Sequence, residues 1–246
     1  MEQLFFAPDI ATVPELPEEE SQHCTRVLRL KTGDIITITD GKGFFYTASI
    51  IDAHPKHCRV QITKQWPQTP IRTFSIHIAV APTKSMDRME WFVEKATEVG
   101  IDTITLLHCL HSERKEIKLQ RLTKIAVSAM KQSQKAFLPK INSMIDFQKF
   151  MSQDFNGIKM IAHCAETSIT SVNPVSKKSV NSVYKPNRHA LVLIGPEGDF
   201  SQEEINAALS AGFVPVSLGE NRLRTETAAL VACHSIHFLN QQFHDK

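Results

Sequence analysis

The 246-residue sequence lacks the features that mark membrane, secreted and zinc-binding proteins. No segment approaches the roughly eighteen consecutive apolar residues that a membrane helix needs. The amino terminus, MEQLFF, has no basic region of the kind that opens a signal peptide. The five cysteines are scattered and form no C-x-x-C pair, which argues against a disulfide framework or a zinc site. We therefore expect a soluble, cytoplasmic protein with reduced, buried thiols and no bound metal.

The sequence also lacks a strong net charge, since 28 Lys and Arg oppose 26 Asp and Glu. The distribution of charge is more informative than the total. Between residues 114 and 140 Glu116 is the only acid, and this basic stripe is either a solvated helix face or a surface that follows a phosphate backbone. The stripe consists of Arg114, Lys115, Lys118, Arg121, Lys124, Lys131, Lys135 and Lys140.

The first seventy residues have the pattern of β-strands. Residues 34–39 and 44–51 flank a turn at 40–43 and predict a hairpin, and residues 58–63 predict a further strand. We expect these strands to close into a small β-barrel. Two prolines in Trp66–Pro70 remove hydrogen-bond donors and predict a domain boundary there, with one domain at 1–70 and a second at 71–246.

After this boundary strands alternate with helices, which favours an α/β domain with a mostly parallel sheet. The polar residues 168–187 predict a long surface loop, and no internal repeat is visible. We expect strands at 74–81, 104–107, 159–163, 191–194 and 214–218, and helices at 85–99, 119–133, 202–211 and 225–239.

A glycine-containing loop, Gly195–Phe200, follows the apolar strand at 191–194. Such loops at the carboxyl ends of strands bring backbone N–H groups close to a ligand. The spacing is that of neither a Walker loop nor a dinucleotide fingerprint. Gly195 and Gly198 therefore indicate either a ligand site or simply a tight turn into the helix that Ser201 caps.

A second loop of this kind follows the strand at 214–218 and leads to a helix for which Thr225 is a plausible cap. Arg224 stands just before this helix, where a guanidinium can hold a carboxylate or a phosphate through paired hydrogen bonds. The alternative is a surface salt bridge to Glu220 or Glu226, contributing about 0 to 1 kcal/mol. Two such loops, close in sequence, predict one shared pocket.

The sequences IGPEGDFS at 194–201 and LGENRLRTETA at 218–228 resemble the signature pair of the bacterial 16S ribosomal RNA uridine-N3 methyltransferases, which belong to the knotted SPOUT superfamily. Residues 84–100 and the block around Gln132, Lys135 and Pro139 are also similar to that family. His23, Val27–Arg29 and Gly33–Asp34 resemble its amino-terminal PUA-like domain. The chain departs from the family at Asp199, where a third glycine is usual, and at Gln3, near an often basic position.

This resemblance implies a SPOUT trefoil-knot methyltransferase domain preceded by a PUA-like β-barrel, with S-adenosylmethionine as cofactor. It also implies a homodimer that acts on uridine 1498 of 16S rRNA in the small ribosomal subunit. For this activity we take Arg224 and Glu226 as the candidate catalytic residues. The cofactor-binding residues are Ile194, Gly195, Glu197, Gly198, Leu218, Gly219, Leu223, Arg224, Glu226 and Ala228. Taking the resemblance together with the basic stripe, the candidate RNA-binding residues are His23, Arg26, Arg29, Lys84, Arg114, Lys118, Arg121, Gln132 and Lys135.

Methyl transfer from a sulfonium mainly requires alignment of donor and acceptor and stabilisation of shifting charge, so neither a nucleophile triad nor a metal is needed. We expect Arg224 to stabilise the developing uracil anion or a nearby phosphate, and Glu226 to fix Arg224 or to receive a proton. Two alternatives stay open. One is a knotted methyltransferase acting on another base or on a ribose 2′-hydroxyl, and the other is a non-catalytic RNA-binding protein.

Overall fold

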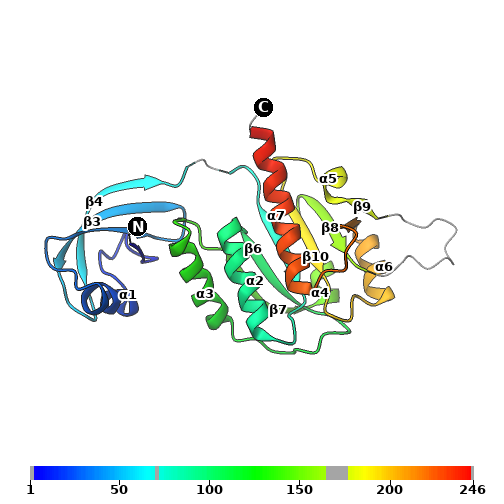
Figure 1. Cartoon of the computed structure of the whole chain (residues 1–246), viewed down its shortest axis with the longest axis horizontal. Coiled ribbons are helices and arrows are strands. Elements are labelled where there is room, and N and C mark those ends of the chain that lie inside the picture. The colour runs from blue at the N-terminus through cyan, green and yellow to red at the C-terminus, as the bar shows by residue number, and fades with distance from the viewer. Residues whose placement is uncertain (1–2, 70–71, 165–176, 245–246) are drawn as a thin grey trace. The chain divides into compact units, whose positions relative to one another are not determined.

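The computed structural model describes residues 3–69, 72–164 and 177–244. The chain forms two compact units, one of residues 1–71 with 126–138 and one of residues 72–125 with 139–246 (Figure 1). The first unit thus takes in a segment that the sequence assigns to the second domain. No helix in the described ranges combines the length and apolar character that crossing a membrane requires.

The first unit is built on a four-stranded sheet with the order β1-β2-β3-β4. The predicted hairpin is confirmed, because β2 and β3 pair antiparallel. Every second residue of β3, from Tyr46 to Ile50, is buried, as expected for a sheet with one face on a core. The strands are β1 (Leu4–Phe6), β2 (Ile35–Thr39), β3 (Phe44–Asp52) and β4 (Arg59–Pro67).

Two short helical segments in this unit correct the expectation that the first seventy residues contain strands alone. They are α1 (Glu18–Gln22) and a π-helical turn at His23–Val27. Pro17 precedes α1 and three glutamates fill its first turn, where the positive end of the helix dipole favours acids. Strand β4 also runs through Trp66 and Pro67, so the predicted linker begins later than expected.

The second unit contains a seven-stranded sheet, counted over the described residues, in which all paired strands are parallel. This confirms the mostly parallel α/β fold. The strand order is β7-β6-β5-β10-β8-β11-β9. The strands are β5 (Ile76–Val80), β6 (Thr103–His108), β7 (Lys140–Asp146), β8 (Ile158–Ala162), β9 (Lys178–Ser179), β10 (Ala190–Ile194) and β11 (Val214–Ser217).

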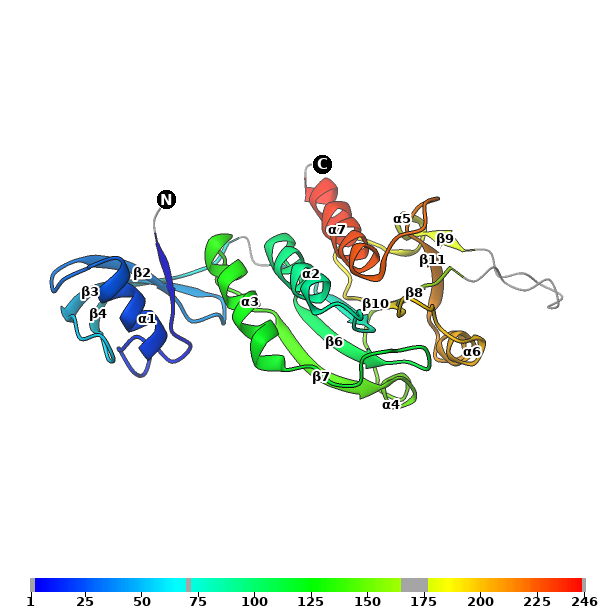
Figure 2. The ribbon, with the colours of Figure 1, turned by 60° about the horizontal axis from the view of Figure 1, so that its bottom comes forward.

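Helices cover both faces of this sheet, which explains why every residue of β10 is buried. Figures 1 and 2 show α2 and α7 side by side on one face, and the other face packs against α4 and α6. The predicted helices are confirmed, although α7 extends further than expected. They are α2 (Met86–Val99), α3 (Leu119–Gln132), α6 (Gln202–Ser210) and α7 (Thr225–His244).

Two helix ends follow the predicted local chemistry. Gly100 ends α2 in the left-handed conformation, with φ 107°. Ser201 and Glu204 form a complete capping box at the start of α6. Helix α3 begins in the second unit and ends in the first, since the division falls at residue 126.

Several elements of the second unit are absent from the sequence-based prediction. Strand β7 and helix α4 (Phe147–Met151) were not predicted. Of the predicted loop at 168–187, residues 168–176 lie outside the described residues. The described remainder contains β9 and α5 (Val180–Val183), so it is not all loop. Both elements are very short, which is why the polar composition hides them.

Candidate functional site

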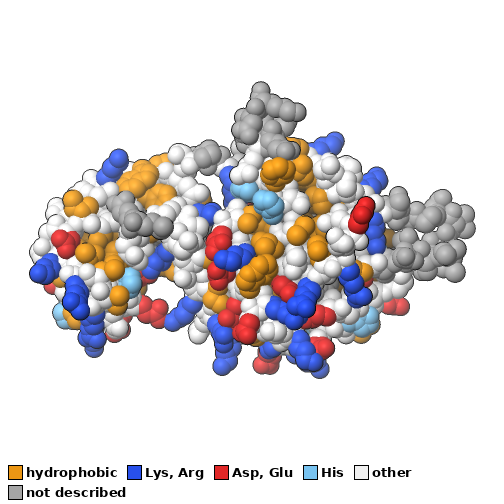
Figure 3. All heavy atoms as spheres, viewed as in Figure 1, with side chains coloured by type: hydrophobic (Ala, Val, Ile, Leu, Met, Phe, Trp, Pro, Cys, Tyr) orange, Lys and Arg blue, Asp and Glu red, His pale blue; other side chains and the backbone are white. Residues whose placement is uncertain are grey.

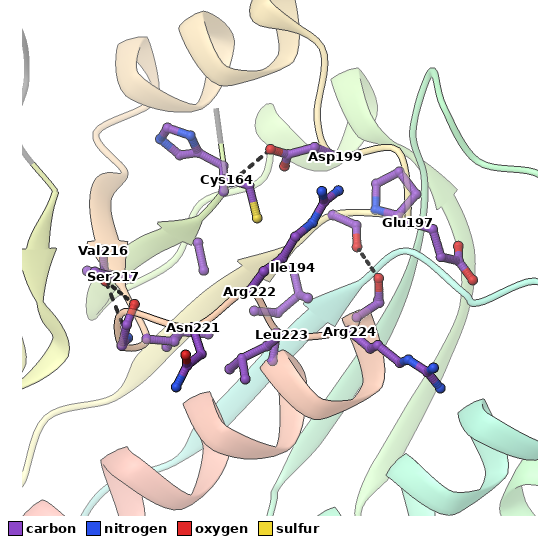
Figure 4. A pocket seen from close by; sticks show the side chains of 18 of the residues that line it. Cys164, Ile194, Glu197, Asp199, Val216, Ser217, Asn221, Arg222, Leu223 and Arg224 are labelled. Carbon is purple, nitrogen blue, oxygen red and sulfur yellow. Dashed lines mark hydrogen bonds between the residues drawn. The ribbon is translucent and has the colours of Figure 1, made fainter. Parts of the chain in front are cut away.

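A cavity of about 930 Å³ opens at the carboxyl ends of β8, β10 and β11, beside the start of α7 (Figure 4). The loops that follow β10 and β11 both line it, as the sequence predicts. Strand β8 lies between these two strands in the sheet and adds a third wall at residues 162–164. Of the ten predicted cofactor residues, eight line the cavity: Ile194, Gly195, Glu197, Leu218, Gly219, Leu223, Arg224 and Ala228.

The loop after β10 is tightly packed. A side chain on Gly195 would place its Cβ 3.1 Å from the Phe200 ring, a contact tighter than most Cβ atoms make, so the packing here favours glycine. Gly198 does not line the cavity. It packs against His111, and a Cβ added to Gly198 would lie 3.1 Å from the His111 Cβ. Glu197 accepts a hydrogen bond from the Lys84 backbone N–H at 2.9 Å. The loop is therefore fixed by packing as well as by backbone hydrogen bonds.

Asp199, the departure from the family glycine, has left-handed backbone geometry with φ 65°. Aspartate tolerates this region better than most residues. Its carboxylate accepts hydrogen bonds from the backbone N–H groups of Cys164 at 2.7 Å and Phe200 at 2.9 Å. Asp199 thus ties the loop after β10 to the end of β8. Cys164 is exposed at this edge, in contrast to the four buried cysteines and to the expectation that all five are buried.

The two motif loops are joined directly. Thr225, predicted to cap α7, is instead its first residue and donates a hydrogen bond from Oγ1 to the Gly195 carbonyl at 3.1 Å. Thr225 is buried, so this bond lies inside the wall of the cavity. Gly219 begins the second loop with φ 130°, a conformation that L-residues rarely adopt. The shared pocket predicted from the sequence is thus held together by a specific bond.

The two predicted catalytic residues lie in different environments. Arg224 is exposed and lines the cavity, and no ion pair joins it to Glu220 or Glu226 among the described residues. Glu226 is buried outside the lining and faces Arg88, with Oε1 3.8 Å from Nε. The salt-bridge alternative for Arg224 is therefore wrong within the described chain. Arg88 itself lines the cavity from α2.

Sequence reasoning missed several residues that line the cavity. Arg88 and the β8 end lie far from the two motifs in sequence, and only the packing of α2 on α7 and the strand order bring them there. Arg222 lies inside the second motif, so its charge was a signal that could have been used. Figure 4 shows its side chain pointing across the cavity in the direction of Asp199, whereas Arg224 points away from Asp199.

The predicted RNA-binding residues of the second unit are Lys84, Arg114, Lys118 and Arg121. Lys84 pairs with Glu113 at 2.8 Å, and the hydrogen bond and charge of Glu113 raise the pKa of Lys84. Arg114 donates to the Lys84 carbonyl at 2.5 Å. Arg121 pairs with Glu90, while Lys118 is exposed.

The remaining predicted RNA-binding residues belong to the first unit. His23 Nε2 lies 3.1 Å from Gln3 Nε2, and its ring packs on Phe5. Arg26 and Arg29 are exposed on the helical turn and just after it, and Arg29 has a left-handed backbone with φ 57°. The last two predicted RNA-binding residues, the exposed Gln132 and the half-buried Lys135, lie at and just after the end of α3.

A parallel α/β sheet with a ligand-sized cavity at adjoining strand ends defines a protein that binds a small molecule at that edge. Residues 70–237 match the RNA methyltransferase domain family, and residues 16–63 match the RNA methyltransferase PUA domain. A ribosomal RNA small subunit methyltransferase E from Buchnera aphidicola is 30% identical over 88% of this chain and 84% of its own length. The chain belongs to the ribosomal RNA small subunit methyltransferase E family, which confirms the resemblance seen in the sequence.

Solved structures support the same assignment. A Porphyromonas gingivalis protein, described as a probable rRNA-methyltransferase, is 45% identical with a TM-score of 0.88, covering 98% of this chain and 99% of that one. The methyltransferase E of Neisseria gonorrhoeae, crystallised with S-adenosyl methionine, is 26% identical with a TM-score of 0.81. That comparison covers 97% of this chain and 98% of that one.

Proposed function

We propose that this chain transfers the methyl group of S-adenosylmethionine to N3 of a uridine in 16S rRNA of the small ribosomal subunit, with uridine 1498 as the target. The observation that carries the proposal is the convergence of three strand ends and both motif loops on one cavity. Its volume, about 930 Å³, is within the range of cofactor sites.

The lining of the cavity fits this cofactor chemically. Ile194, Val216 and Leu223 supply apolar surface for a nucleoside. Charged side chains of both signs line the same cavity, as a ligand that is apolar in one part and zwitterionic in another requires. When bound, S-adenosylmethionine supplies an activated methyl group. The ten predicted cofactor residues remain part of this proposal, with Gly198 and Glu226 supporting the wall from outside the lining.

The chain itself has to orient the uracil and stabilise charge on it. Uracil N3 lies on the pairing edge, so the base must be unpaired before it can reach the cavity. Arg224 is exposed at the cavity and carries no ion pair among the described residues, so its guanidinium is available to a uracil oxygen or a phosphate. Glu226 is buried and faces Arg88, so we assign it to holding that arginine.

RNA binding is assigned to the PUA unit and to the predicted cations of both units. Lys118, Arg26 and Arg29 are exposed and are the most direct candidates for phosphate contacts. Arg114 instead donates a hydrogen bond to the Lys84 carbonyl. The ion pair between Arg121 and Glu90 would have to break before Arg121 could contact RNA. Their contribution to RNA affinity is therefore expected to be smaller.

The proposal includes the finer architecture of the family. The barrel is supported by the bridge between Glu15 and Arg59, which pairs a further segment with the first residue of β4. The trefoil knot is proposed from the match of residues 70–237 to the RNA methyltransferase domain family. A homodimer is supported by exposed apolar residues on α2 and α7, including Trp91 at 40% and Phe238 at 46% exposure, in the region where Figure 3 shows hydrophobic side chains gathered. We place the reaction in the cytoplasm, with the ribosomal subunits.

The test is incubation of methyl-labelled S-adenosylmethionine with small subunits that lack the modification, followed by mapping of the label and mass analysis of the nucleosides. Label in 3-methyluridine at one 16S position is the expected result. Label in another nucleoside would point to a different acceptor. Absence of cofactor binding in a calorimetric titration would favour the non-catalytic RNA-binding alternative. Undiminished transfer by Arg224→Ala at saturating cofactor would overturn the role of Arg224.

A further inference from the structure

We propose that Arg222 and Asp199 form a subsite for the amino-acid end of the methyl donor, with Arg222 binding its carboxylate and Asp199 its ammonium group. This inference rests on the proposed function and deepens it. Both residues line the same cavity, one from the loop after β11 and one from the loop after β10. Neither role is implied by the resemblance that identified the motifs.

Arg222 presents its charge to the cavity. Figure 4 shows the side chain extending from its loop across the cavity in the direction of Asp199. The residue is exposed and makes no ion pair with any part of the chain that the structure describes. A guanidinium that spans a cavity in this way offers several N–H donors in the fork that matches a carboxylate.

Asp199 is held rigidly at the opposite wall. Its two carboxylate oxygens accept from the backbone N–H groups of Cys164 and Phe200, at 2.7 and 2.9 Å. These bonds fix the position of the carboxylate, and an ionised carboxylate, with about four lone-pair sites, can accept from more than two donors. The φ of 65° at Asp199 places the residue in the turn itself. A preorganised acid of this kind suits a cationic group on a ligand.

The combination of charges distinguishes an amino acid from a phosphate. A phosphate would favour cations alone, and a fixed carboxylate within the same subsite would repel it. An α-amino acid carries one group of each sign on a single carbon and satisfies an arginine and an aspartate together. Lys177, whose Nζ donates to the Cys164 carbonyl at 3.1 Å, adds a further cation at this end. The apolar side chains Ile194, Val216 and Leu223 are then left for the nucleoside.

The test compares calorimetric binding of three nucleosides to the full-length protein in the absence of RNA. S-adenosylhomocysteine carries the complete amino-acid end, decarboxylated S-adenosylmethionine keeps the ammonium but lacks the carboxylate, and 5′-methylthioadenosine lacks both. Arg222→Ala should lower the affinity for S-adenosylhomocysteine by roughly ten- to a hundredfold, which corresponds to the loss of a hydrogen bond to a charged group. Its affinity for the other two nucleosides should change less than about twofold.

Asp199→Asn keeps one acceptor oxygen and tolerates the same backbone conformation. It should lower the affinity for S-adenosylhomocysteine and for decarboxylated S-adenosylmethionine, and leave the affinity for 5′-methylthioadenosine unchanged. Arg188→Ala, which removes an exposed arginine outside the cavity lining, is the matched control and should leave all three unchanged.

Equal losses for all three nucleosides in Arg222→Ala, or no loss for any, would overturn the subsite while leaving the proposed function intact. Weakened RNA binding by Arg222→Ala with unchanged S-adenosylhomocysteine affinity would also overturn it and assign Arg222 to phosphate. Failure of the unaltered protein to bind S-adenosylhomocysteine and S-adenosylmethionine would overturn the proposed function and the subsite together.

Discussion

The Glu226 carboxylate at the start of α7 faces the Arg88 guanidinium of α2, with Oε1 3.8 Å from Nε. The glutamate is buried, with a side-chain exposure of 8%, and its other oxygen has no hydrogen-bond partner among the described residues. Arg88 lines the cavity and Glu226 does not. We therefore propose that Glu226 influences the reaction by positioning Arg88.

This relationship predicts that the two residues act as a unit. Arg88→Ala and Glu226→Ala should each lower the rate of methyl transfer, by roughly tenfold or about 1.4 kcal/mol of transition-state stabilisation. The double variant should be no slower than the less active of the two single variants, because the effects of substitutions at contacting residues are not additive. Rates at saturating cofactor and RNA measure this. Fully additive losses would show that Glu226 acts independently, as in the proton-acceptor hypothesis.

The left-handed backbone at Asp199 predicts an order of stability among its variants. Asp199→Ala places a residue with little tolerance for φ 65° in the turn and removes two carboxylate hydrogen bonds, whereas Asp199→Gly removes the bonds without the strain. The alanine variant should be less stable than the glycine variant by about 1 kcal/mol. Urea denaturation with equal m-values measures the difference. Equal midpoints would mean that the turn relaxes.

The basic stripe predicts a graded salt dependence of RNA binding. Lys118→Ala should reduce the slope of log affinity against log salt concentration by about 0.7 to 0.9 for each lost phosphate contact. Arg121→Ala should change it less, since Arg121 is already paired with Glu90. Lys149→Ala, an exposed lysine on α4, is the control. If Lys118→Ala and Lys149→Ala give the unaltered slope, Lys118 belongs to a solvated face.

His77 on β5 predicts a loss of stability in mild acid. Burial lowers the pKa of His77 from its ordinary 6.5 to about 4, with Lys140 contributing, and its Nε2 lies 2.8 Å from Thr105 Oγ1. Between pH 6.5 and 4 the unfolded chain binds a proton that the folded chain does not, so this contribution to stability is complete above pH 6.5 and declines as the pH falls. The total is on the order of 3 kcal/mol.

The matched variant is His77→Gln, which can still hydrogen-bond Thr105 but does not titrate. Its free energy of unfolding should fall less than that of the unaltered protein between pH 7 and pH 4.5. Parallel pH profiles for the two proteins would contradict the assignment of this acid sensitivity to His77.

Local sequence patterns predicted the regular elements well where a period or a cap was present. The run of apolar residues in α2 and the capping box at Ser201 are local signals, and both helices follow them. Elements of four or five residues, such as α4 and α5, are too short to show a period. The helical turns at 18–27 were missed although Pro17 and the three glutamates after it are a recognisable helix start.

The candidate site shows the same division. Gly195, Leu218 and Arg224 were predicted from the motifs that contain them, and all three line the cavity. The β8 end could not be predicted, because the sequence places it some thirty residues before β10 while the sheet inserts β8 between β10 and β11. Arg88 is further still from the motifs and reaches the cavity because α2 packs beside α7.

By itself the sequence determined the α/β pattern, the two motif loops and the family, because these depend on local periodicity and on short runs of specific residues. The tertiary structure decided which charged side chains share the cavity: Glu226 lies behind Arg88, and Arg222 faces the wall that carries Asp199. The physical reason is that strand order and helix packing set distances between segments remote in sequence, and local patterns carry no information about those distances.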